Sequence, residues 1–250
     1  MVKGASIRFT NYVESVPKIL GLLKLGNEIK KYDKIVLKPW ISMNDEESTD
    51  IAFVEAVLKY VSDNKNPVAE VFIAEGVDGE ETDRLFAKMG YLRLAERYSV
   101  GLVDLNKAET EVVDEFDFAK FEGINYPKIL KESFVISLPK LSEHEEFGML
   151  GGLSNMLGAF PSDYYKGFFS KSKNKIRKHG ISYSIHDIVQ CKMPDFSVVD
   201  SSEQGILIAG LSEEMDRQGA RILGRNWEEI EYLRLLEEGR QKKEEMSEEE

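Results

Sequence analysis

The chain is poor in cysteine and has no long apolar run. Its 250 residues contain one cysteine, Cys191, so it cannot form an intramolecular disulfide, a four-thiolate iron–sulfur cluster or a zinc site with several cysteines. No segment approaches the ~18 uninterrupted apolar residues of a membrane-spanning helix. The first 26 residues do not resemble a signal peptide, because charged residues interrupt them: Arg8, Glu14, Lys18 and Lys24. We therefore expect a cytoplasmic protein with no intrinsic iron–sulfur cluster, and its cofactor, if any, stays unknown.

The chain also has fewer positive than negative charges. The 33 Lys and Arg stand against 45 Asp and Glu, a net charge of -12, which disfavours nucleic acid and an anionic membrane as partners. Residues 164–186 differ, since they contain no Asp or Glu and place aromatic residues among six cations: Lys166, Lys171, Lys173, Lys175, Arg177 and Lys178. Such a segment can bind a small anionic ligand or an acidic protein partner. The alternative is a helix whose aromatic residues pack inward and whose lysines point into water.

Short apolar runs alternate with helical stretches, which predicts an α/β fold: a mostly parallel or mixed central sheet with helices on both faces, in a single domain. The predicted strands are 35–37, 71–74, 100–105, 134–138, 196–199 and 206–209. Helices are expected after Ser48 or Thr49 as a cap, after Asp78 as a cap, and at about 213–223 and 227–238. Residues 1–239 should form the domain, and residues 240–250 a frayed acidic tail.

Polar residues follow several of these strands. In open α/β sheets, ligands bind beyond the carboxyl ends of the strands. Lys38 follows the first strand and Lys140 the fourth, each beside a proline, and a lysine so placed can bind a phosphate or carboxylate or can simply extend into water. His144 lies among glutamates, which would hold its imidazole protonated, or it is an ordinary surface histidine.

An acidic turn and a glycine-rich stretch add further candidates. The turn contains Glu75, Asp78, Glu80 and Glu81; it could hold a hard cation such as Mg²⁺, but helix capping explains most of these acids, and we expect no metal. Residues 147–158 contain four glycines and Asn155, without a P-loop or G-x-G-x-x-G pattern. Glycine here allows close approach to a ligand or close packing of elements. Cys191 is expected to be a buried thiol rather than a nucleophile.

Taken in order, these segments resemble the prokaryotic family called domain of unknown function 362, whose members sometimes carry a ferredoxin-type iron–sulfur module. The resemblance covers about residues 30–240 and rests on IVLKPW, VFIAEG, VISLPKLSEH, GLSNMLG, FSVVD with Asp200, and the closing helices with Asp216 and Gly224. The chain departs from the family pattern at Trp40, Ser142, Glu143 and Ser154 and in the shortened turn SSEQG. The resemblance implies a divergent member without the iron–sulfur module, and it implies a fold rather than a reaction.

Two hypotheses follow. In the first, Lys38, Lys140, His144, Asn155 and Asp200 converge in one cavity that binds a small anionic ligand, with His144, Lys140 and Asp200 as candidate catalytic residues and Lys38, Asn155 and Glu75 as candidate ligand-binding residues. The lysines would bind the anion, His144 would act as general acid or base, and Asp200 would orient a partner or a cation. In the second, the chain is a degenerate, non-catalytic assembly or regulatory module that acts through protein partners. The sequence leaves open whether the protein is an enzyme.

Overall fold

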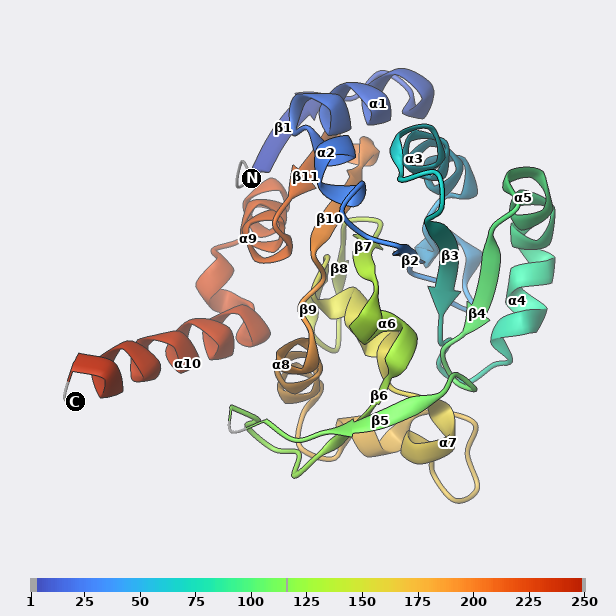
Figure 1. Cartoon of the computed structure of the whole chain (residues 1–250). Helices are drawn as coiled ribbons and strands as arrows, with labels where there is room; N and C mark the ends of the chain where they lie inside the picture. The colour runs from blue at the N-terminus through green and yellow to red at the C-terminus, as the bar shows by residue number, and fades with distance from the viewer. Residues whose placement is uncertain (1–3, 116, 249–250) are drawn as a thin grey trace.

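The central feature of the fold is a seven-stranded mixed sheet, seen in a computed structural model that describes residues 4–115 and 117–248. Along the sheet the order is β1 (Gly4–Arg8), β11 (Ile206–Gly210), β10 (Phe196–Ser201), β7 (Phe134–Leu138), β2 (Lys34–Pro39), β3 (Glu70–Glu75) and β4 (Gly101–Asp104) (Figure 1). The last five strands in this order are parallel, and β11 is antiparallel to both of its neighbours. The predicted α/β fold with a mixed central sheet is confirmed.

Helices cover both faces of the sheet, as predicted (Figure 1). The first face packs on α1 (Tyr12–Leu22), α2 (Leu25–Ile29), α3 (Ile51–Asn64), α4 (Thr82–Lys88) and α5 (Tyr91–Tyr98). The second face packs on α6 (Lys128–Glu132), α7 (Ser162–Tyr165), α8 (Ile181–Cys191), α9 (Ser212–Ile222) and α10 (Glu231–Glu248), with the 3-10 helices η2 (Ser154–Ala159) and η3 (Asn174–Arg177). Two hairpins lie beside them: β5 (Thr110–Val113) with β6 (Ile124–Pro127), and β8 (Ser142–His144) with β9 (Gly148–Leu150).

Strand alternation decides which face receives each polar side chain. Ile35 and Leu37 of β2 belong to the core of the first face, whereas Val36 belongs to the core of the second. Because successive side chains of a strand point to opposite faces, Lys38 lies on the second face with Val36. By the same rule, Lys140 follows Leu138 onto the first face.

Two predicted helix caps are wrong. Asp50 caps α3, since its carboxylate accepts the Ala52 backbone N–H at 2.7 Å, while Thr49 instead donates to the Leu138 carbonyl at 2.6 Å. Asp78 caps no helix; α4 begins at Thr82, and the Asp78 carboxylate accepts the backbone N–H of Lys173 at 2.6 Å. Both side chains are used for contacts between distant segments, which local patterns do not reveal.

Two segments expected to be helical also differ from the expectation. The basic segment 164–186 is broken into α7, η3 and the start of α8, with Gly180 at a φ of 93° between the last two. Within it, Phe168 and Phe169 are 95% and 97% exposed, so the inward-packing alternative does not describe these two rings. The last helix continues past the predicted end at residue 238 to Glu248, and Arg240 binds Glu213 at 2.5 Å. None of the helices in residues 4–115 and 117–248 is long and apolar enough to cross a membrane.

Candidate functional site

Three of the predicted site residues form a buried polar cluster at the carboxyl ends of β2 and β3: Lys38, Glu75 and Asn155. The Lys38 ammonium donates to Glu75 Oε2 at 2.7 Å, to the Asn155 carbonyl at 2.7 Å and to Asn155 Oδ1 at 3.1 Å. Asn155 Nδ2 in turn donates to the Lys38 carbonyl at 2.8 Å and to Ser137 Oγ at 2.9 Å. Burial lowers the pKa of Lys38, and the Glu75 carboxylate opposes this effect. With three acceptors for its three hydrogens, Lys38 holds Glu75 in place.

Gly158 permits this cluster to be closely packed. A Cβ atom at residue 158 would lie 1.9 Å from Glu75 Oε1 and 2.7 Å from Lys38 Nζ. Gly76 also packs closely, since a Cβ atom at this residue would lie 2.4 Å from the Gly158 carbonyl oxygen. Of the two interpretations of the glycine-rich stretch, close packing against the ion pair therefore applies at Gly158.

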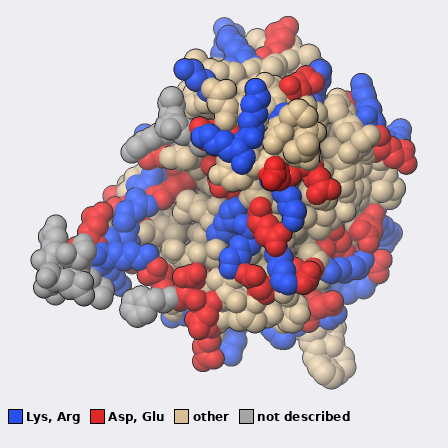
Figure 2. Space-filling model, viewed as in Figure 1, with Lys and Arg blue, Asp and Glu red and all other residues tan. Residues whose placement is uncertain are grey.

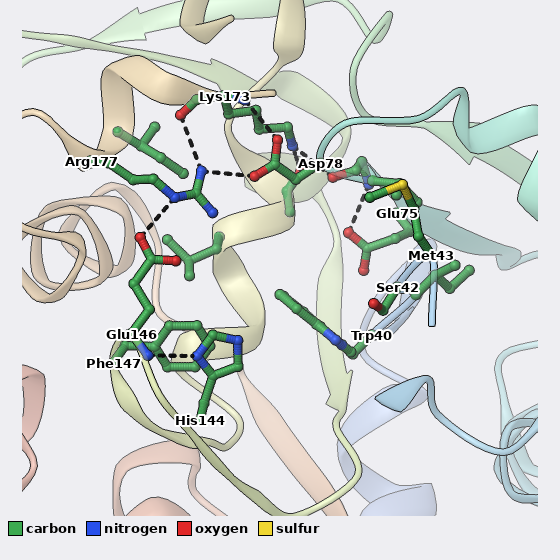
Figure 3. A pocket seen from close by; sticks show the side chains of 16 residues that line it. Trp40, Ser42, Met43, Glu75, Asp78, His144, Glu146, Phe147, Lys173 and Arg177 are labelled. Atoms are coloured by element: carbon green, nitrogen blue, oxygen red, sulfur yellow. Dashed lines mark hydrogen bonds and ion pairs between the residues drawn. The ribbon is translucent and has the colours of Figure 1, made fainter. Parts of the chain in front are cut away.

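A cavity of about 110 Å³ lies next to the cluster (Figure 3). It lies beyond the carboxyl end of β2. In the sheet, β3 and β4 lie on one side of β2, whereas the later strands β7 and β10 lie on its other side. This arrangement is a topological switch point, where open α/β sheets bind ligands. The lining comes from four segments of the chain: Trp40 to Met43, Glu75 to Asp78, the β8–β9 hairpin with His144, Glu146 and Phe147, and the stretch from Leu157 to Arg177 with Gly158, Lys173 and Ile176.

Arg177 joins two sides of this cavity. Its Nη1 lies 2.8 Å from Asp78 Oδ2 and its Nε lies 2.7 Å from Glu146 Oε1. Burial works to lower the pKa of Arg177, but its bonds to Glu146 and Asp78 outweigh burial and raise it. Nη2 takes part in neither ion pair, and Figure 3 shows it turned toward the cavity. Arg177 therefore keeps one donor group available on the cavity side.

Lys173 is a second fully buried lysine at this site, with 1% of its surface exposed. Its ammonium donates to the Gly76 carbonyl at 2.6 Å and to the Gly158 carbonyl at 3.4 Å. Among the described residues, no carboxylate oxygen lies within 4.0 Å of this nitrogen, the distance limit of an ion pair. Burial lowers the pKa of Lys173 to about 8. The sequence placed Lys173 among surface cations, because nothing in the pattern distinguishes it from its exposed neighbours.

His144 forms an aromatic wall of the cavity together with Phe147. The two rings stack with centroids 3.6 Å apart and an interplanar angle of 13°. Burial lowers the pKa of His144 in spite of the nearby Glu146 and Glu47, which works against the protonated form expected from its acidic neighbours. Its Nδ1 accepts the Glu146 backbone N–H at 3.2 Å, which assigns the hydrogen of the neutral ring to Nε2. In this form His144 is a hydrogen-bond donor through Nε2.

Lys140 and Asp200 lie elsewhere, in a groove of about 490 Å³ on the first face of the sheet. Tyr12 donates its hydroxyl to Asp200 Oδ2 at 2.8 Å, and Lys140 Nζ lies 2.8 Å from Glu203 Oε1. His144 lines the cavity, with Lys38 and Asn155 packed behind its wall. The five residues expected in one cavity are therefore divided between two places, because strand alternation sends Lys38 and Lys140 to opposite faces.

The predicted acidic turn is not gathered around a cation. Glu75 pairs with Lys38, Asp78 with Arg177, and Glu80 with Arg84 at 3.0 Å. In the described part of the chain, no three His, Cys, Asp or Glu side chains come together in a way that could hold a metal ion. Cys191, also considered from the sequence, is partly buried, and burial raises the pKa of its thiol to about 12.

Comparisons with known proteins agree with the fold. The model of a family described as a domain of unknown function (DUF362) matches residues 35–207. The lactate racemase apoprotein from Thermoanaerobacterium thermosaccharolyticum is 17% identical, with a TM-score of 0.57 over 89% of this chain and 57% of that one. A Thermotoga maritima protein is 13% identical, with a TM-score of 0.51 over 85% of this chain and 59% of that one. The chain thus spans under two thirds of either neighbour, and no curated protein matches it.

Proposed function

This chain belongs to the domain of unknown function (DUF362) family, and we propose that it binds a small carboxylate in the cavity beside Lys173 and Arg177. The observation that carries the proposal is Lys173. A buried ammonium group costs much less free energy when an anion lies beside it, and the nitrogen of Lys173 contacts only carbonyl oxygens among the groups described. A ligand carboxylate would supply a negatively charged partner within ion-pair distance of this nitrogen.

The other charged groups of the cavity also favour binding of a carboxylate at the end where Lys173 lies. Glu75 is neutralised by Lys38, and Asp78 and Glu146 share Arg177. An incoming carboxylate therefore meets its strongest attraction at Lys173, where Arg177 Nη2 and the Nε2–H of His144 are further donors. Charge-assisted hydrogen bonds of this kind are the strong ones in proteins.

The size of the cavity limits the ligand. A buried water needs roughly 10–15 Å³ of such space, so about 110 Å³ admits several waters or an organic acid of a few carbon atoms. The neighbour from T. thermosaccharolyticum is named a lactate racemase, and lactate is an acid of this size. That neighbour supports the choice of ligand class for a first experiment.

Isothermal titration calorimetry with lactate, pyruvate and acetate tests the proposal. We expect binding of at least one of them to the unaltered protein and a loss of roughly tenfold or more in affinity in Lys173→Met, the value of one charge-assisted hydrogen bond. Lys171→Met is the matched control, because the Lys171 side chain is 73% exposed. Circular dichroism checks that both variants are folded. Absence of binding by all three acids, or equal affinity in both variants, would contradict the proposal.

The second candidate function is protein binding, favoured by the exposed aromatic pair Phe168 and Phe169. These rings lie between Lys166 and Lys171, so the loop would fit an acidic protein partner with an apolar pocket. Over the face shown in Figure 2, basic and acidic groups intermingle, which is unlike the single-sign surface of a nonspecific nucleic-acid binder. Affinity capture from the source cells tests this function: a stoichiometric partner should be lost in Phe168→Ser/Phe169→Ser and kept in Val112→Ser, a substitution of another exposed apolar residue.

A further inference from the structure

We propose that Lys173 forms an imine with the carbonyl carbon of a small 2-oxo acid, so that the cavity binds this class of carboxylate covalently. The inference rests on the proposed function, because the same cavity and the same carboxylate are involved. It adds the reacting atom, Lys173 Nζ, and the feature that the ligand needs beyond its carboxylate, a ketone or aldehyde group.

The two buried lysines of the site differ in the way that imine formation requires. In the part of the chain that the structure describes, Lys38 and Lys173 are the only lysines with almost no exposed surface. Lys38 is bonded to a carboxylate and to two further acceptors, which holds its charge and occupies its hydrogens. Lys173 has carbonyl acceptors alone and lines the cavity. Lys173 can therefore lose a proton and react, whereas the Glu75 carboxylate beside Lys38 favours the protonated form of that lysine.

The burial of Lys173 supplies free amine near neutral pH. Because burial lowers its pKa to about 8, the Lys173 amine is neutral in roughly a tenth of the molecules at pH 7. An unperturbed lysine, with a pKa above 10, is neutral about a thousandth of the time or less. Lysines desolvated in this way are the ones that act as nucleophiles toward carbonyl groups.

The reaction needs no other reagent. The lone pair of Nζ attacks the carbonyl carbon and forms a C–N bond, while the carbonyl oxygen takes a proton to give a carbinolamine. The C–O bond then breaks, and the oxygen leaves as water with the two hydrogens that the amine has lost. The product C=N nitrogen gains one proton from solvent and then donates this hydrogen to the Gly76 carbonyl, the acceptor that Lys173 now contacts at 2.6 Å. The Glu75 and Asp78 carboxylates favour that positive charge, as they do for the ammonium.

The geometry also leaves donors for the rest of the ligand. Arg177 lies four residues beyond Lys173, its Nη1 lies 3.5 Å from the Lys173 carbonyl, and its Nη2 turns toward the cavity. His144 offers Nε2–H from the opposite hairpin. These two donors line the same cavity as Lys173 and are available to the carboxylate of a 2-oxo acid joined to it.

Reductive trapping tests the inference. The unaltered protein is incubated at pH 7.5 with pyruvate and sodium cyanoborohydride, which reduces an imine to a stable secondary amine, and the site is mapped by proteolysis and mass spectrometry. We expect one added group on Lys173, formed roughly a hundredfold faster than on any exposed lysine, as the ratio of the two neutral fractions gives. No adduct, or adducts spread over exposed lysines with Lys173 unmodified, would overturn the proposal. Because this map uses the unaltered protein, it does not depend on whether a Lys173 variant folds.

Two controls separate this inference from the proposed function. Lactate, which has no carbonyl to attack, should bind and slow the labelling by pyruvate without being trapped itself. Lys171→Met should be labelled like the unaltered protein, and Lys173→Met should not be labelled at residue 173 or at any new site. Binding of lactate without any pyruvate adduct rejects the imine alone; failure of lactate, pyruvate and acetate to bind rejects the proposed function as well.

Discussion

Replacing Lys38 with methionine should destabilise the protein strongly, because the change leaves the Glu75 carboxylate buried without its cation. Glu75 is 1% exposed, and its remaining short bond would be the Gly76 N–H at 2.8 Å. The substitution also removes the donor for both Asn155 oxygens. Breaking a buried ion pair in this way costs about 3–5 kcal/mol in the free energy of unfolding.

A double substitution separates the cost of an uncompensated charge from that of lost packing. In Lys38→Met/Glu75→Met both charges are gone, and replacement of a whole buried pair by apolar residues is often close to neutral. We therefore expect the double variant to be more stable than Lys38→Met by about 1–3 kcal/mol. The matched surface control is Lys59→Met, since Lys59 and Asp63 pair at 2.8 Å with side chains 65% and 58% exposed, and such pairs contribute about 0–1 kcal/mol.

Urea denaturation followed by far-ultraviolet circular dichroism at pH 7 measures these differences. The slope of free energy against urea should stay constant through the series, so that shifts in the midpoint report stability. The reasoning fails if Lys38→Met loses no more stability than Lys59→Met. It also fails if the stability lost in Lys38→Met/Glu75→Met equals the sum of the losses in Lys38→Met and in the single variant Glu75→Met.

Further predictions concern packing, a loop anchor and pH. Gly158→Ala should lower stability by about 1–3 kcal/mol, because the new Cβ would lie 1.9 Å from Glu75 Oε1; an unchanged thermal midpoint would contradict this. Asp187→Ala should speed hydrogen exchange at the backbone amides of residues 119–121, because the Asp187 carboxylate accepts hydrogen bonds from these amides at 2.7–3.0 Å. Equal protection of these amides in the variant would argue against Asp187 as the anchor of this loop. Carboxylate binding should weaken from pH 7 to pH 9, because burial lowers the pKa of Lys173 to about 8 and its ammonium is present below that pH and lost above it; calorimetry showing a constant Kd would exclude Lys173 as the binding cation.

The strands of the sheet interior were predictable from their apolar runs. Five of the six predicted strands correspond to the interior strands β2, β3, β7, β10 and β11, since strands covered on both faces need continuous apolar residues. The sixth corresponds to the edge strand β4. The edge strand β1 was missed because Gly4–Arg8 is only partly buried and carries no such run. It forms through its pairing with β11, which lies about 200 residues away in the chain, and a local pattern carries no information on such a partner.

The candidate site was predictable only in part. Lys38 and Glu75 lie at the carboxyl ends of adjacent parallel strands, so strand order brings their backbones to the same edge of the sheet. The separation of Lys140 from Lys38 follows from counting alternate positions from Leu138 and from Val36, but only once the register of β2 and β7 is known. Lys173 could not have been found, because its burial depends on the path of the loop between α7 and η3 and on the contact of its backbone with Asp78.

A crystal structure of the protein grown with lactate tests the central claim most directly. The account predicts electron density for one carboxylate in the cavity lined by Trp40, His144, Lys173 and Arg177, with a carboxylate oxygen within about 3 Å of Lys173 Nζ or Arg177 Nη2. Lactate seated instead in the groove with Lys140 and Asp200, or a cavity that holds only water at saturating lactate, would contradict it.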